Sequence, residues 1–257
     1  MRKSAAKALE EAINSARAGM LSARGPEERF AALTSSLATA GLDQINYGFF
    51  DPEAAYRSQA DVVLMSTMPD SWLSHYHDES LQLTDPHVLH VRGGSLEPYS
   101  WGRTKVDALD DARQRRTARR ISEAGQRSAI CTPLASPLSA RIPVAGMTLG
   151  SSLEERDFAG ITGGEGWRLI SLVHQFHDLS LGEFHRREIG AQPLTPRERD
   201  CLRYAAEGLQ QDAIGHKLGL ARVTVETHLR KARSKLKTRS LPQAVARAIV
   251  FGEIPPV

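Results

Sequence analysis

The sequence has few cysteines and no long apolar run. Only two cysteines, Cys131 and Cys201, occur among 257 residues, and we expect them in different domains, which argues against a structural disulfide. No uninterrupted apolar stretch approaches the length of a membrane span. The opening residues MRKSAAKALEEA are charged almost at once, which argues against a secretory signal. We therefore expect a cytoplasmic protein that does not enter a membrane.

Sequence signatures of enzymes are missing as well. There is no GxSxG nucleophile motif, and the pairs Gly93-Gly94 and Gly163-Gly164 belong to neither a P-loop nor a dinucleotide fingerprint. Histidines crowd residues 75–90, but no carboxylate or thiol completes a ligand set typical of a metal site. These absences argue against an enzyme, a cofactor and a functional metal ion.

The composition is that of a globular protein with more than one core. A hydrophobic fraction of 41% in 257 residues is enough for two domains. The segment REIGAQP, residues 187–193, has few apolar anchors and contains a glycine and a proline, as linkers do. The pattern predicts an N-terminal domain over residues 1–186 and a C-terminal domain over residues 194–257.

The N-terminal domain mixes helical and strand-like patterns. Helical spacing of apolar residues covers residues 4–17, 26–40, 69–81, 106–124 and 165–187. Runs rich in β-branched and aromatic residues, typical of strands, cover residues 45–50, 62–68, 127–133 and 144–149. These runs predict an α+β fold, in which helices cover both faces of a sheet of four or five mostly antiparallel strands.

The C-terminal domain reads as four short helices. Thr195 and Glu198, with a proline after the threonine, predict a capping box that opens the first helix. Gly219 supplies the tight turn that ends the second helix and lets the third cross it. Ser240 and Gln243 predict another capping box, which opens the fourth helix.

The third of these helices, expected over residues 221–237, has two different faces. Val225, Leu229, Ala232 and Leu236 recur at i, i+4, i+7 and i+11, so we expect them to pack inward. The outward face should present Val223 and Ser234 together with the candidate DNA contacts Arg222, Thr224, Glu226, Thr227, Arg230, Lys231, Arg233 and Lys235.

Positive charge is concentrated in this part of the chain. Residues 195–240 contain eleven Lys or Arg and five Asp or Glu, a net charge of +6, whereas the whole chain has a net charge of +3. A basic helix held across a tight turn can enter a DNA major groove while its flanking charges neutralise phosphates. The alternative from charge alone is a solvated basic helix in an ordinary bundle, and it stays open here.

Several separated motifs resemble the LuxR-type helix-turn-helix family: LTPRE at residues 194–198, TVETH at residues 224–228, Lys235-Leu236 and the Ala-Val-Ala of the last helix. The resemblance implies a homodimer that binds an inverted-repeat site in double-stranded promoter DNA, with RNA polymerase as a further partner. Gly215 departs from the usual alanine, and Ala221 stands where serine or threonine often caps the recognition helix. Each departure costs about 1 kcal/mol of local helix stability.

The stretch from Trp72 to Trp101 contains the candidate ligand-binding side chains. Trp72 and Tyr76 are four residues apart, hence on one helical face, and Asp85-Pro86 follows. An indole N–H, a phenol and a carboxylate on an apolar wall can orient a small amphiphilic ligand. The alternative is that both aromatic residues belong to the core and that Asp85 is a turn residue before proline.

The WxxxY motif, the Asp-Pro pair, Trp101 and the segment GQRSAICTPL at residues 125–134 resemble the autoinducer-binding domain of LuxR quorum-sensing regulators. This resemblance implies an α/β/α sandwich that binds an N-acyl homoserine lactone. Trp72 would donate to the lactone carbonyl, Tyr76 would donate to the acyl carbonyl, and Asp85 would accept from the amide N–H. The full set of implied ligand-binding residues is Trp72, Tyr76, Asp85, Trp101, Thr148, Tyr99 and Met68.

Together the two resemblances predict a ligand-responsive transcriptional regulator of quorum sensing. Within the same family, a regulator whose pocket binds a non-lactone ligand, or needs none, is the alternative. A phosphorylation-controlled response regulator shares this DNA-binding module, but the βα alternation of a receiver domain is not found in the sequence.

Overall fold

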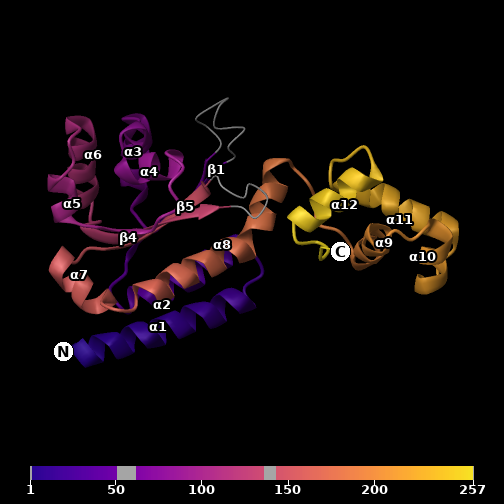
Figure 1. Ribbon diagram of the computed structural model, residues 1–257, viewed down its shortest axis with the longest axis horizontal. Helices are drawn as coiled ribbons and strands as arrows, with labels where there is room; N and C mark the ends of the chain where they lie inside the picture. Colours follow the sequence, from indigo (N-terminus) through magenta and orange to yellow (C-terminus); the bar gives the residue numbers. More distant parts are fainter. Residues whose placement is uncertain (1, 51–61, 136–142, 257) are drawn as a thin grey trace. The chain divides into compact units, whose positions relative to one another are not determined.

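The computed structural model describes residues 2–50, 62–135 and 143–256 (Figure 1). The chain forms two compact units, Met1–Leu179 and Ser180–Val257. The division falls within one long helix, N-terminal to the linker that the sequence suggests at residues 187–193.

The first unit contains a five-stranded sheet in which every neighbouring pair is antiparallel. In sheet order, the strands are β2 (Val62–Ser66), β1 (Gln44–Phe50), β5 (Pro143–Ser151), β4 (Ser128–Ala135) and β3 (Tyr99–Trp101). The expected mostly antiparallel sheet is confirmed. The short edge strand β3 was not among the runs expected to form strands.

Helices cover both faces of this sheet, so the expected sandwich is confirmed (Figure 1). One face is covered by α1 (Arg2–Ser22), α2 (Pro26–Ala38) and α8 (Gly166–Glu188). The other carries α3 (Asp70–Asp78), the 3-10 turn η1 (Leu81–Leu83), α4 (Pro86–Arg92), α5 (Arg103–Asp107) and α6 (Ala112–Glu123). Between β5 and α8 lies α7 (Glu155–Thr162).

Alternation along β1 gives the sheet one apolar and one partly polar face. Tyr47 is fully buried, and its ring centroid lies 5.1 Å from that of Phe176 on α8. Phe176 in turn meets Phe30 of α2 at 6.0 Å, which forms the aromatic centre of the core. Asn46 and Gly48 alternate onto the opposite face, below α3 and α4.

Two helices expected to be longer are shorter or divided. The helix expected over residues 69–81 ends at Asp78, and Ser80, at a φ of 53°, separates it from η1. The helix expected over residues 106–124 is divided into α5 and α6. The cause is Asp111, whose side chain accepts from two backbone amides and caps the start of α6.

The second unit contains the last turns of α8 and a four-helix domain, as predicted for the helix-turn-helix. The helices are α9 (Pro196–Ala206), α10 (Gln211–Leu218), α11 (Arg222–Lys235) and α12 (Leu241–Val250). All four residues expected on the inward face of the third helix are buried: Val225, Leu229, Ala232 and Leu236.

One of the two expected capping boxes is complete and the other is half formed. The Thr195 amide donates to Glu198 Oε2 at 2.8 Å, and the Glu198 amide donates to Thr195 Oγ1 at 3.4 Å. At α12 the Gln243 amide donates to Ser240 Oγ at 3.3 Å, as expected. Gln243 Oε1, however, accepts from the amide of Arg239 at 3.0 Å instead of that of Ser240.

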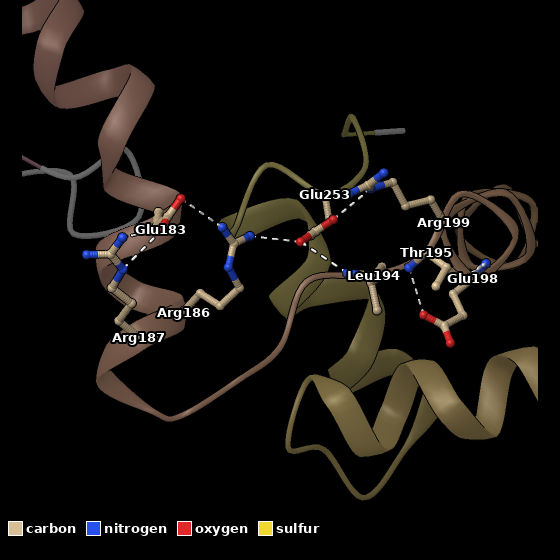
Figure 2. A network of polar contacts seen from close by, with 8 residues as sticks. All are labelled: Glu183, Arg186, Arg187, Leu194, Thr195, Glu198, Arg199 and Glu253. Carbon is tan, nitrogen blue, oxygen red and sulfur yellow. Dashed lines mark hydrogen bonds and ion pairs between the residues drawn. The ribbon is translucent and has the colours of Figure 1, made fainter. Parts of the chain in front are cut away.

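A buried carboxylate ties the second unit together (Figure 2). Glu253, with a side chain only 3% exposed, accepts from Arg186 Nη1 at 2.8 Å and from Arg199 Nε at 2.7 Å. The amide of Leu194 also donates to it, at 3.4 Å. These contacts join the end of α8, the start of the four-helix domain and the chain after α12, so Arg186 belongs structurally with the second unit.

Candidate ligand cavity and DNA-binding surface

A cavity of about 340 Å³ lies in the first unit, between the sheet and the helices α3 and α4. Trp101 does not line it: this residue is buried against Val106, Ala118 and Ala129, and its indole N–H meets no acceptor among the described residues. Six of the seven residues proposed for ligand binding do line it: Met68, Trp72, Tyr76, Asp85, Tyr99 and Thr148.

Part of the cavity floor has no side chains. Gly48 on β1 and Gly146 on β5 are register partners, and both line the cavity. A Cβ at Gly146 would lie 2.9 Å from Val91 Cγ2 of α4, so the glycine allows the helix to approach the sheet. At Gly146 the missing side chain is therefore replaced by Val91 of α4, which packs closely over this part of the sheet.

Asp85 is the buried acidic group of the cavity wall. As the N-cap of α4 it accepts from the His87 amide at 2.8 Å through Oδ1. Its Oδ2 accepts from the Tyr76 hydroxyl at 2.6 Å, and Trp72 stands beside Tyr76 with the ring centroids 6.2 Å apart. Burial, and then the Asp85 charge, raise the pKa of Tyr76, so the phenol stays protonated. The three residues of the predicted constellation do converge.

A row of polar side chains crosses the whole sheet on the cavity side. Directly opposed residues share a face of a sheet, and one continuous register joins Tyr99, Cys131, Thr148, Asn46 and Ser66 from β3 to β2. All of these except Ser66 line the cavity. The sequence analysis named Tyr99 and Thr148 but missed Asn46, an amide between the apolar residues Ile45 and Tyr47.

Hydrogen bonds connect the β2 end of this row to a further amide. Ser66 Oγ donates to Asn46 Oδ1 at 2.5 Å. Asn46 Nδ2 donates to Thr148 Oγ1 at 3.3 Å and to Gln126 Oε1 at 2.8 Å. Gln126 is 2% exposed and also lines the cavity, and no sequence signal had singled it out.

His87 connects the other end of the row. Its Nε2 lies 3.4 Å from Gln126 Nε2, and its Nδ1 lies 2.6 Å from the Tyr99 hydroxyl and 3.1 Å from Cys131 Sγ. Burial lowers the pKa of the imidazole, and the charge of Asp85 opposes this only in part. Near neutral pH, His87 is therefore a neutral hydrogen-bonding group in the cavity wall.

The other buried histidine has a structural partner. His177 Nδ1 lies 3.0 Å from the Tyr47 hydroxyl in the core. Over residues 2–50, 62–135 and 143–256, no three His, Cys, Asp or Glu side chains form a group that could hold a metal ion. A search of the same residues finds no helix that is both long enough and apolar enough to cross a membrane.

The outward face of α11 carries most of the predicted DNA contacts. Arg222, Glu226, Arg230 and Lys231 are exposed, and Val223 is 70% exposed. Thr224, Thr227 and Arg233 are partly buried on the same helix. Exposed side chains on this face of the helix therefore extend from Arg222 to Lys231.

Lys235 is placed differently from the other predicted contacts. Its Nζ lies 2.7 Å from Glu198 Oε2, and its side chain is 24% exposed. Although burial opposes it, the hydrogen bonds from Lys235 and Thr195 lower the pKa of Glu198 below its ordinary value. The ion pair between Lys235 and Glu198 thus links α11 to the capping box of α9.

The turn before α11 explains one departure from the family pattern. A Cβ at Gly215 would lie 2.5 Å from the carbonyl oxygen of Leu220, so this helix position has no room for the usual alanine. Gly219 ends α10 at a φ of 65°, as expected. Ala221, the N-cap of α11, makes no side-chain cap hydrogen bond, so this helix start lacks the stabilisation of a serine or threonine.

A sandwich that encloses a cavity, followed by a four-helix domain with an exposed basic helix, defines a ligand-binding regulator of DNA. Residues 25–179 match the family described as autoinducer binding domain, and residues 192–248 match the bacterial regulatory proteins of the luxR family. The chain therefore belongs to the LuxR family of bacterial regulatory proteins. It is a regulatory protein, as predicted, and not an enzyme.

Similar proteins cover most of the chain. The quorum sensing-dependent transcriptional regulator VjbR of Brucella abortus is 30% identical over 203 residues, which are 77% of this chain and 76% of VjbR. The transcriptional activator LuxR of Aliivibrio fischeri is 25% identical over 200 residues, 76% of either chain.

Solved structures agree with the fold. Escherichia coli SdiA matches with a TM-score of 0.50 and 16% identity, over 93% of this chain and 96% of SdiA. The N-acylhomoserine lactone dependent factor CepR2 of Burkholderia cenocepacia matches with a TM-score of 0.51 and 17% identity, over 65% of this chain and 93% of CepR2.

Proposed function

We propose that this protein is a quorum-sensing transcription factor that binds an N-acyl homoserine lactone in the cavity. As a homodimer it binds an inverted-repeat promoter site through α11, in the cytoplasm, where RNA polymerase is its further partner. The quorum-sensing role of VjbR and the lactone dependence of CepR2 support this assignment.

The observation that carries the ligand assignment is the buried carboxylate of Asp85 in a cavity with largely apolar walls. Asp85 accepts one hydrogen bond at each oxygen, and a carboxylate has room for about four. A buried acceptor that stays under-satisfied costs free energy, and an amide N–H of the ligand supplies the missing donor. Trp72 then donates to the lactone carbonyl, and the acyl chain lies among apolar side chains such as Met68 and Leu73.

On the DNA side, the exposed residues of α11 divide by position. Glu226, Thr227 and Arg230 lie nearest the bases, and Val223 at the first turn joins them. Arg222, Thr224, Lys231 and Arg233 contact phosphates. Lys235, which is paired with Glu198, acts by holding the helix in place.

Ligand binding acts on this protein through stability. A lactone that binds only the folded, dimerised state stabilises that state by mass action. At a ligand concentration 100 times the dissociation constant, this amounts to about 2.7 kcal/mol.

Thermal unfolding of the full chain with a panel of N-acyl homoserine lactones tests the proposal. We expect one range of chain lengths to raise the melting temperature, and Asp85→Ala and Trp72→Phe to remove the shift. Trp167→Phe is the matched control, because Trp167 is 68% exposed and does not line the cavity. If no lactone changes the melting temperature of the folded protein, the cavity binds another class of ligand or none, and the DNA-binding assignment stands alone.

A further inference from the structure

The hydrogen bonds along the cavity wall run in one direction. The backbone N–H of Met68 donates to Ser66 Oγ at 3.0 Å, so the serine hydrogen is available to Asn46 Oδ1, 2.5 Å away. Asn46 therefore accepts through its oxygen on one side and donates through Nδ2 to Gln126 Oε1 on the other. The direction is carried by the amide groups of Asn46 and Gln126, since in each of them the oxygen accepts and the nitrogen donates.

The direction continues through Gln126 to His87. Because Gln126 Oε1 faces Asn46, its Nε2 faces His87 Nε2, and an amide nitrogen can only donate. His87 Nε2 is then an acceptor, so the single ring hydrogen of the neutral imidazole is on Nδ1. Nδ1 donates to the Tyr99 hydroxyl oxygen, 2.6 Å away.

The hydrogen bonds from Ser66 through Asn46, Gln126 and His87 form a relay that leaves the hydroxyl hydrogen of Tyr99 without a strong acceptor. Its hydrogen-bond partner is Cys131 on the neighbouring strand, whose thiol sulfur is a weak acceptor. Tyr76, in contrast, donates its hydrogen to Asp85 Oδ2 at 2.6 Å. Of the two tyrosines in the cavity wall, Tyr76 uses its hydrogen to hold Asp85, whereas the hydrogen of Tyr99 can pass from the weak acceptor Cys131 to a stronger acceptor on a ligand.

We propose that Tyr99, oriented by the relay of Ser66, Asn46, Gln126 and His87, donates the hydrogen bond to the acyl carbonyl of the ligand. The resemblance to known regulators would give this role to Tyr76. The inference rests on the proposed function, because Asp85 must accept the amide N–H of the same ligand. Tyr76 donates directly to Asp85 Oδ2, and Tyr99 lies 2.6 Å from the ring of His87, whose backbone amide donates to Asp85 Oδ1, so both phenols line the same part of the cavity as Asp85.

The relay also gives the cavity a chemical preference. A wall that ends in a hydroxyl donor favours ligands with a strong acceptor, such as a carbonyl oxygen, at this place. Gln126 and His87 are positioning residues, since they act on the ligand only by fixing which atom of Tyr99 carries the free hydrogen.

The first test needs no ligand. Nitrogen-15 NMR of the full chain distinguishes protonated from unprotonated imidazole nitrogens, and a His87→Asn variant identifies the His87 signals. We expect hydrogen on Nδ1 and none on Nε2, and a loss of this preference in Gln126→Met, which keeps the side-chain length but removes the amide. Hydrogen on Nε2 in the unaltered chain would reverse the relay and overturn the proposal.

The second test pairs a ligand atom with a residue. The probes are the lactone with the most stabilising chain length and its thioamide analogue, in which the acyl C=O becomes C=S, a weaker acceptor. We expect the unaltered chain and Tyr76→Phe to bind the thioamide about tenfold more weakly than the amide. Tyr99→Phe should bind the two probes equally. A tenfold difference that persists in Tyr99→Phe and disappears in Tyr76→Phe would assign the donor to Tyr76 instead.

The two tests separate this inference from the proposed function. If lactones bind and the C=O to C=S difference does not depend on Tyr99, the proposed function stands and the role of Tyr99 is wrong. If no lactone binds, the proposed function and the role of Tyr99 toward a lactone both fail, while the NMR result still shows whether the relay exists.

Discussion

The cavity wall and the outward face of α11 both carry polar side chains. Those of the cavity wall are hydrogen-bonded within the protein, whereas those of α11 are exposed to solvent. In the cavity wall, Gln126 is hydrogen-bonded to Asn46 on one side and to His87 on the other, and Gln126 and His87 are buried. On α11, Glu226 and Arg230 are exposed and form no ion pair with another described residue. A buried polar group without a partner costs about 1–3 kcal/mol, whereas an exposed one is hydrated. The cavity is therefore organised before ligand arrives, and α11 keeps its polar groups for DNA.

This difference predicts where a substitution changes stability and where it changes binding alone. Substitution of a buried polar group that is hydrogen-bonded within the protein should lower the free energy of unfolding. Substitution of an exposed polar group on α11 should leave the free energy of unfolding unchanged and weaken only the binding of DNA. The predictions below test that division, from the largest expected effect to the smallest.

The largest effect is expected at Glu253, the buried carboxylate of the second unit. Glu253→Ala leaves the guanidinium groups of Arg186 and Arg199 without their shared partner, so the free energy of unfolding should fall by about 3 kcal/mol. Urea unfolding of the full chain measures it. Glu207→Ala, at an exposed position of the same unit, is the control and should change stability by less than about 0.5 kcal/mol. Equal effects at the two positions would show that the Glu253 network contributes nothing.

Substitution of Arg230 should change DNA binding and not stability, which is the opposite of the result expected at Glu253. Arg230→Ala should weaken binding to the specific site by about 1–3 kcal/mol and leave the unfolding transition unchanged. Random-sequence selection first supplies the site, and titration against that site and against scrambled DNA measures the loss. Lys231→Ala is the control, and as a phosphate contact it should weaken both DNAs alike. The same pattern for Arg230→Ala would make Arg230 a phosphate contact too.

Gly215 tests the turn that presents α11. Gly215→Ala would bring a Cβ against the Leu220 carbonyl oxygen, so we expect a loss of about 1–3 kcal/mol of stability. Gly160→Ala in α7 is the matched control: the added methyl meets nothing within 4 Å, and alanine favours a helix by about 1 kcal/mol over glycine. A stable Gly215→Ala variant would mean that the turn adjusts without cost.

The sequence predicted correctly those features that depend on residues close together in the chain. The period of Val225 and Leu229 predicted the inward face of α11, and Thr195 with Glu198 predicted the start of α9. The polar row beneath the cavity is different, since Tyr99, Thr148 and Asn46 become neighbours only through strand register. No spacing in the sequence reports that register, so Trp101 was expected in the cavity wall, while Asn46 and Gln126 were missed.

Glu253 was missed for a similar reason. It is a single acidic residue in the tail FGEI, where local pattern predicts an exposed carboxylate. Its burial follows from two arginines that are far away in the chain, Arg186 and Arg199. The same contacts place the end of α8 with the second unit, which the composition of residues 187–193 did not indicate.

A smaller effect is expected when protonation of His87 at low pH lowers the free energy of unfolding. Burial lowers the folded-state pKa below the unfolded value of about 6.5, so the contribution of the neutral ring is fully present above that pH. It is lost as pH falls from there through the folded pKa, by at most about 1.4 kcal/mol for each pH unit. The titratable groups that face this ring are Asp85, His90, Tyr99 and Cys131.

Denaturant unfolding between pH 5 and 7.5 measures this loss. His87→Gln should flatten the slope, whereas His75→Gln, at an exposed position, should leave it unchanged. An unchanged slope in His87→Gln would show that the ring accepts a proton in the folded state as readily as in the unfolded state, and it would weaken the argument for a neutral His87 in the relay.

The smallest effect is expected at Val223, an apolar side chain 70% exposed on a polar face. In a major groove the natural apolar partner is the methyl group of thymine, and a buried methyl contributes about 0.8 kcal/mol. Val223→Ala should therefore weaken binding to the selected site by about 1 kcal/mol or less. Val223→Thr, which keeps one methyl, should lose less.

Deoxyuridine lacks the thymine methyl and separates this contact from other causes. Replacing each thymine of the site in turn should identify one position whose substitution weakens the unaltered protein as much as Val223→Ala does. At that position Val223→Ala should lose nothing more, because the two changes remove the same contact. If the two losses add at every thymine, Val223 does not contact a thymine methyl group.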